Sequence, residues 1–204
     1  MSKATITRRS FLLSALVASV SCRTSLAEAL LSKEEWMAAW MDAPKPKEAI
    51  GQLWLGRFLD PMYFLLKPIE WRPNEPQTQA YPSVQVPEGF VTDLASIPWP
   101  LWSAGLRPDG QYAFAAIIHD FLYWTQSTKR AEADDILKLA MQDLRVSPAV
   151  IETIFVGVRA GGEAAWNGNA ELKTRGEKRI LQNFPDSATV KWEEWKARPD
   201  VFAK

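Results

Sequence analysis

The sequence predicts an α+β fold, with small antiparallel sheets or hairpins in the N-terminal half and a helical half that contains a buried antiparallel helix pair. Three observations favour this class. Short apolar and aromatic runs separated by prolines fill much of the first half. The second half carries longer stretches with helical periodicity. Hydrophobic residues make up 47% of the 204 residues and charged residues 24%, which is typical of a chain with a packed core.

The first 27 residues indicate an export signal. Basic residues precede an apolar run at 11–20 that is too short to span a bilayer, and small residues follow at 25–27. The segment around Arg8 and Arg9 resembles the twin-arginine signal, which implies the twin-arginine translocase as a partner and a periplasmic or secreted protein. An alternative is a lipoprotein anchored at Cys22, because residues 19–22 loosely resemble a lipobox. We expect no transmembrane segment after signal removal.

Composition excludes several function classes. The formal net charge is zero, and removing residues 1–27 takes away four basic residues and no acidic ones, which argues against nucleic acid as a partner. A single Cys excludes an intramolecular disulfide framework and a multi-thiolate zinc site. A single His excludes every mechanism that needs two imidazoles.

We expect the fold to follow a short N-terminal helix and linker at 28–60. Five prolines make 68–87 an extended loop in this interpretation. The other elements expected in the first half are strands at 52–58 and 62–66, a short strand at 84–86, a strand passing into a loop at 90–97, and a second loop at 102–110.

Helices are expected from residue 111 onward. Asp109 is a candidate N-cap for the first of them, and Ser147 followed by Pro148 predicts the start of the third. The expected helices are 111–124, 131–144, 148–166, 171–182 and 187–196. Glycines 157, 161 and 162 would let another backbone approach the third helix, and tryptophans 192 and 195 would dock the last one. We place the main domain at 61–168 and a C-terminal helical extension at 169–204.

The helix at 111–124 carries the most chemical information. It is apolar on every face over 113–118, and such a helix is buried. His119 and Asp120 follow directly within it. A buried imidazole beside a buried carboxylate is costly unless both are satisfied, and such groups gather at functional sites.

The next helix supplies a partner for the histidine. Asp134 lies at the edge of the apolar stripe, and a short connection makes the two helices antiparallel neighbours, so Asp134 is placed to reach His119. A histidine oriented by a carboxylate is the general-base arrangement. Asp120 points elsewhere and is free to bind a hard cation. The alternative is a structural hydrogen-bonded pair without catalytic use.

Residues 92–96 contain further candidates. Asp93 is a candidate metal ligand, and Ser96 is a candidate nucleophile activated by His119. Alternatively, Thr92, Asp93 and Ser96 cap turns through bonds from side chain to backbone. The aromatic loop at 98–102 would line an apolar channel or touch lipid, or pack on the core.

Three blocks of sequence resemble a known family. Residues 86–98 (VPEGFVTDLASIP), 110–123 (GQYAFAAIIHDFLY) and 130–141 (RAEADDILKLAM) resemble, in this order, the bacterial and phage family catalogued as domain of unknown function 1353. The resemblance covers about 62–166. It implies no activity.

The run from His119 to Tyr123 is also similar to the H-D-x-x-Y signature of secreted phospholipases A2. That resemblance implies His119 as the base, Asp120 as a Ca²⁺ ligand, Asp134 as the acid that orients the base, and Tyr123 as its support. Backbone carbonyls of the loop at 102–110 would complete the calcium site. The chain departs from that family in lacking its disulfides and in matching its glycine-rich calcium loop only loosely.

Two functions follow from these patterns. The first is an exported ester hydrolase acting on a lipid-like substrate, with a lipid or envelope component as its partner and Ca²⁺ as its cofactor. The second is a non-enzymatic envelope or phage-derived module in which the His, Asp and Tyr side chains form a structural network. The sequence leaves open whether the protein is an enzyme.

Overall fold

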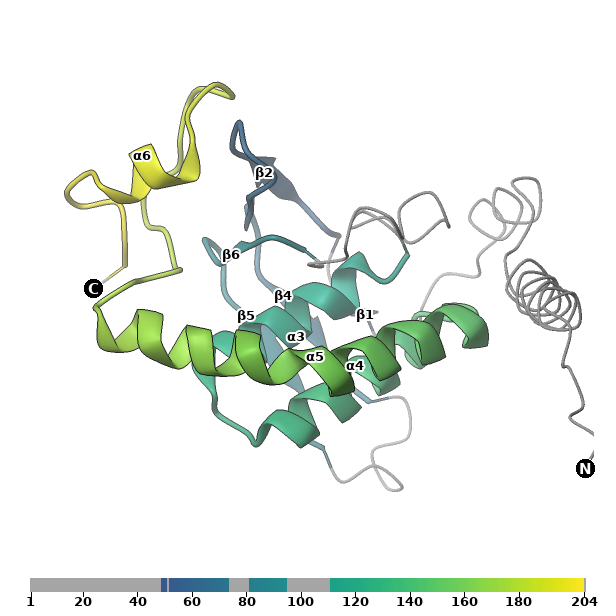
Figure 1. The fold of residues 1–204 in the computed structure, drawn as a ribbon. Coiled ribbons are helices and arrows are strands. Elements are labelled where there is room, and N and C mark those ends of the chain that lie inside the picture. Colours follow the sequence, from purple (N-terminus) through teal and green to yellow (C-terminus); the bar gives the residue numbers. More distant parts are fainter. Residues whose placement is uncertain (1–48, 51, 74–80, 95–110, 204) are drawn as a thin grey trace, which may run out of the picture. The chain divides into compact units, whose positions relative to one another are not determined.

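The computed structural model describes residues 49–50, 52–73, 81–94 and 111–203, all of which fall within the compact unit Pro44–Lys204. Within these ranges, short strands come first and helices follow (Figure 1). The predicted α+β class is therefore confirmed. The segments at 1–48 and 95–110 lie outside the described residues. They include the predicted export signal, Cys22, Ser96 and both predicted loops at 98–102 and 102–110.

The strands form two small antiparallel sheets. In one sheet β4 lies between β1 and β5, and in the other β3 lies between β2 and β6. The register pairs Ile69 with Val86 in the first sheet and Phe64 with Val91 in the second. The strands are β1 (Ala49–Ile50), β2 (Leu55–Arg57), β3 (Tyr63–Leu65), β4 (Ile69–Trp71), β5 (Val84–Val86) and β6 (Val91–Thr92).

Strand β4 corrects the expectation of an uninterrupted extended loop at 68–87. Pro68 and Pro73 lie just outside the strand, so neither removes a hydrogen bond from its ladder. Ile69 and Trp71 are buried while Glu70 between them is not, which is the alternation of a half-buried strand. The short strand expected at 84–86 is confirmed as β5.

Helix α3 is the centre of the fold. It contacts β5 and β6 on one side and α4 and α5 on the other, and α5 crosses both α3 and α4 (Figure 1). All of its residues from Ala113 to His119 are buried, as the apolar pattern predicts. The helices are α3 (Ala113–Thr125), α4 (Arg130–Asp143), α5 (Pro148–Thr174) and α6 (Trp192–Lys196).

The helix boundaries need three corrections. The N-cap of α3 is Tyr112, so Asp109 does not occupy that position. Helix α5 continues to Thr174, past the expected end at 166, and α6 covers only the last part of 187–196. The expected helix at 171–182 is wrong, because Gly176 has a φ of +86° just beyond the end of α5 and terminates the helix.

The chain after Gly176 pairs with strand residues instead. Ile180 forms an antiparallel bridge with Phe90, and Leu181 forms another with Phe202. Trp192 and Trp195 are buried in a second cluster with Phe58 and Phe64, so the prediction that these tryptophans dock the last helix is confirmed. None of the described helices is long and apolar enough to cross a membrane.

Candidate active site

Helices α3 and α4 bring the three predicted catalytic side chains together. His119 and Tyr123 are one turn apart on α3, and Asp134 faces them from α4. Nε2 of His119 lies 3.0 Å from Oδ1 of Asp134, and the Tyr123 hydroxyl donates to the same oxygen at 2.6 Å. The short connection between the helices makes this meeting possible, as the sequence predicts.

The other oxygen of Asp134 faces two arginines. Nη1 of Arg130 donates to Oδ2 at 3.1 Å, and Nε of Arg159 lies 3.7 Å from it. The Asp134 side chain has no exposed surface. Burial alone would raise its pKa, but the hydrogen bonds from His119 and Tyr123 and the charge of Arg130 outweigh burial and lower it. Asp134 is therefore an ionised carboxylate at neutral pH.

His119 is held as a neutral imidazole. It is 8% exposed, and burial lowers its pKa, although the bond to Asp134 acts in the opposite direction. The acceptor at Nε2 is an ionised carboxylate oxygen, so the ring proton resides on Nε2. Among the described residues Nδ1 has no hydrogen-bond partner.

Asp120, the next residue along α3, faces a different neighbourhood. The Thr92 hydroxyl at the end of β6 donates to its Oδ2 at 2.5 Å, and the Leu94 amide donates to the same hydroxyl at 2.9 Å. Burial raises the pKa of Asp120 well above its usual value, and the negative charge of Asp93 raises it further. The two predicted metal ligands, Asp93 and Asp120, are thus brought together, and Thr92 makes the turn contact expected of it.

This pair of carboxyl groups fits a hard cation in part. Carboxylate and hydroxyl oxygens are the donors that Ca²⁺ and Mg²⁺ prefer. The described ranges contain no group of three His, Cys, Asp or Glu side chains around one point, so a cation here needs further oxygens. The positive charge of Arg179 also reaches Asp120 and lowers its pKa, against the larger effects of burial and Asp93.

The sequence analysis did not assign four residues to this site: Arg130, Arg159, Gly162 and Arg179. Arg130 and Asp134 are four residues apart on one helix, a spacing that could have indicated their contact. Arg159 and Arg179 have no such local signal, because they reach the site from other elements. Gly162 was predicted, with its neighbours, to admit another backbone. It admits instead the hydroxyl of Tyr123, which a Cβ at this position would strike.

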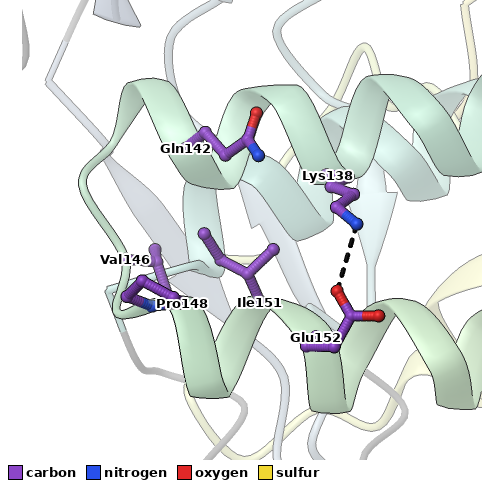
Figure 2. A pocket seen from close by; sticks show the side chains of 6 residues that line it. All are labelled: Lys138, Gln142, Val146, Pro148, Ile151 and Glu152. Atoms are coloured by element: carbon purple, nitrogen blue, oxygen red, sulfur yellow. Dashed lines mark hydrogen bonds and ion pairs between the residues drawn. The ribbon is translucent and has the colours of Figure 1, made fainter.

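A pocket of about 400 Å³ lies elsewhere, between α4 and α5 (Figure 2). The ion pair from Lys138 to Glu152, at 3.1 Å, crosses it. None of the predicted site residues lines it. The lining residues are Lys138, Gln142, Val146, Pro148, Ile151 and Glu152.

Residues 71–158 match a family model described as a protein of unknown function (DUF1353). This match confirms the resemblance to that family that the three sequence blocks predict. The matched segment includes His119, Asp120, Tyr123 and Asp134, whereas Arg159 and Arg179 lie beyond its end. Comparisons of the chain with curated proteins and with solved structures gave no match.

Proposed function

We propose that this protein hydrolyses ester bonds in lipid-like substrates, in the manner of a phospholipase A2. The observation that carries the proposal is the state of His119. Its Nε2 is bound to an ionised, fully buried carboxylate, while its Nδ1 has no partner among the described residues. That is the arrangement of a general base with an orienting acid.

The reaction follows from these groups. Nδ1 of His119 takes a proton from a water molecule as the water oxygen forms a bond to the ester carbonyl carbon. Asp134 stabilises the imidazolium that results, and Tyr123 and Arg130 hold Asp134 in place. The bond to the alcohol oxygen then breaks, and the imidazolium returns the proton to that oxygen, which yields a free acid and an alcohol. A cation held by Asp93 and Asp120 would polarise the carbonyl.

Export is part of the same proposal. Residues 1–27 have the paired arginines, short apolar run and small residues of a twin-arginine signal. We infer that the mature chain acts in the periplasm or outside the cell, where lipid and envelope components are accessible, with lipid anchoring at Cys22 as the alternative.

The test measures fatty-acid release from phosphatidylcholine and phosphatidylglycerol vesicles, with 5 mM Ca²⁺ or a chelator, by the purified protein. We expect His119→Gln to lower the rate by about 10²–10⁴-fold while the far-UV spectrum is unchanged. Arg175→Gln, in an exposed ion pair with Glu171 on α5, is the matched control and keeps full activity. Asp120→Asn should remove any dependence on Ca²⁺.

One combination of results would contradict this proposal. If the wild-type protein releases no fatty acid from either vesicle, and His119→Gln only lowers the melting temperature, then the His119, Tyr123 and Asp134 network is structural. The proposed hydrolase is then wrong.

A further inference from the structure

Asp134 divides its two carboxylate oxygens between two groups of partners. Oδ1 accepts hydrogen bonds from His119 and Tyr123, both on α3. Oδ2 accepts a hydrogen bond from Arg130 on its own helix and forms an ion pair with Arg159 on α5. A carboxylate can rotate about its bond to Cβ, so the direction of Oδ1 is set by whatever holds Oδ2. The arginines are therefore in the position to orient the acid that orients His119.

An arginine at position 130 does not stabilise the helix that contains it. It is the first residue of α4, where the positive end of the helix dipole disfavours a cation by roughly 0.3–1 kcal/mol. Its acidic partner lies four residues later, and this order of charges is the weaker one within a helix. The guanidinium thus lies where local helix energetics oppose it, and it is stabilised there by its contacts with Tyr123 and Asp134.

The packing of α5 leaves room for this contact. A Cβ built at Gly162 would strike the hydroxyl of Tyr123 and would come within 3.5 Å of Nη1 of Arg130. The absence of a side chain at this buried position lets both donors reach Asp134 from the same side of the helix pair. Arg159 constrains the orientation of the Asp134 carboxylate less than Arg130 does, because it lies farther from Oδ2 and also donates to Asp135.

We propose that Arg130 is a positioning residue for the His–Asp dyad: it anchors Oδ2 of Asp134 so that Oδ1 accepts from both His119 and Tyr123, and thereby holds the His119 ring in its Nε2–H tautomer. The use of that tautomer in hydrolysis rests on the proposed function. The positioning itself does not, because it concerns the geometry of the resting protein.

The experiment exploits the single histidine of the chain. Long-range ¹H–¹⁵N spectra of the full chain, recorded where the imidazole is neutral, report directly which ring nitrogen carries the proton. The wild-type protein should show a protonated Nε2 and an unprotonated Nδ1. In Arg130→Met we expect the two ¹⁵N shifts to move toward each other as the tautomers mix. Arg130→Lys, which keeps the charge, should restore part of the difference.

Two comparisons separate positioning from a general structural role. Arg175→Met removes an exposed arginine that directly follows the end of α5 and should leave the His119 shifts unchanged. On active protein, Arg130→Met should lower kcat by about ten- to a hundredfold with little change in KM, because a misplaced base affects the chemical step rather than substrate binding.

The decisive negative result is a folded Arg130→Met protein whose His119 shifts equal those of the wild type. If that variant does not fold, wild-type shifts in both Arg130→Lys and Arg130→Gln overturn the proposal in the same way. A wild-type protein without hydrolytic activity, but with a tautomer that depends on Arg130, would refute the proposed function and leave the positioning role intact.

Discussion

His119 and Asp120 are neighbours in the sequence but face opposite electrostatic surroundings. The carboxylate that binds His119 accepts hydrogen bonds from three side chains and forms an ion pair with a fourth, Arg159, so that two of its four partners are cationic. Asp120 receives one hydroxyl and lies beside a second carboxyl group, Asp93. The pKa of Asp134 is accordingly lowered, whereas burial and Asp93 raise the pKa of Asp120.

The difference shows that burial alone does not decide the charge of a carboxyl group. Both groups are largely withdrawn from solvent, and in both burial is the largest single influence on the pKa. At Asp134 the donors outnumber the acceptors, so the anion is stabilised. At Asp120, burial and the negative charge of Asp93 outweigh the Thr92 hydroxyl and the charge of Arg179, so the protonated form is favoured. Among the described residues, only Asp134 has its negative charge stabilised, so we call its side of α3 the complete side and the Asp120 side the incomplete side.

The largest expected effect is at the complete side. Asp134→Asn should lower the free energy of unfolding by about 3–5 kcal/mol, because the carboxylate is fully buried and its loss leaves a partly buried arginine and two other donors without their anion. Urea unfolding of both proteins measures this. Glu152→Gln removes an ion pair between α4 and α5 that is more exposed, and should change stability by less than about 1 kcal/mol. Equal effects of the two substitutions would show that the Asp134 network contributes no more to stability than an exposed ion pair.

Adjacent glycines of α5 provide a second comparison. Gly162→Ala should destabilise the protein by about 1–3 kcal/mol, because the added Cβ meets the Tyr123 hydroxyl. A Cβ at Gly161 meets nothing within 4 Å, so Gly161→Ala should stabilise α5 by up to about 1 kcal/mol. Thermal unfolding of the pair tests the packing around Tyr123. Two substitutions with the same sign and size would show that this packing is loose.

The pH dependence of stability should reveal the state of His119. Burial lowers its pKa from 6.5, so just below pH 6.5 the unfolded chain binds a proton that the folded chain does not. The contribution is therefore fully present above pH 6.5, and it is lost as the pH falls through the folded-state pKa. We expect His119→Asn to flatten this part of the stability curve. An NMR titration of His119 with a midpoint at or above 6.5 would contradict the assignment.

The smallest effect is expected at the incomplete side. Asparagine resembles the protonated form of Asp120, which the raised pKa favours, so Asp120→Asn should change stability by no more than about 0.5 kcal/mol below pH 3.8, where the wild-type carboxyl group is protonated in both the folded and the unfolded state. The wild-type protein should then lose stability relative to the variant as the pH rises above 3.8 and through the folded-state pKa of Asp120. Denaturation of both proteins at several pH values checks this, and a variant that instead loses stability relative to the wild type as the pH rises would show an ionised carboxylate.

Much of this site was accessible from the sequence. The wholly apolar run before His119 predicted a buried helix, and the stripe around Asp134 predicted a second helix packed against it. The inferences on these two helices succeeded because they depend on local periodicity and on one short connection. Tyr123 came instead from the similarity to the H-D-x-x-Y signature. The pairing of Asp93 with Asp120 was a weaker expectation, and the fold brought these two residues together.

Other features depended on tertiary structure. Strand β4 was hidden by the prolines around it, because only its pairing with β1 and β5 shows that they lie outside the ladder. Arg159 and Arg179 reach the site from elements distant in sequence, and no local pattern marks them. Gly162 was marked as a point of close approach, but only the fold shows that Tyr123 occupies the space beside it. The charge of each carboxyl group was likewise decided by the fold, because a pKa reflects the sum of donors, acceptors and burial at one point in space. The sequence by itself determined which residues lie on one helix face; which oxygen each of them binds was decided only where α3, α4, α5 and β6 meet.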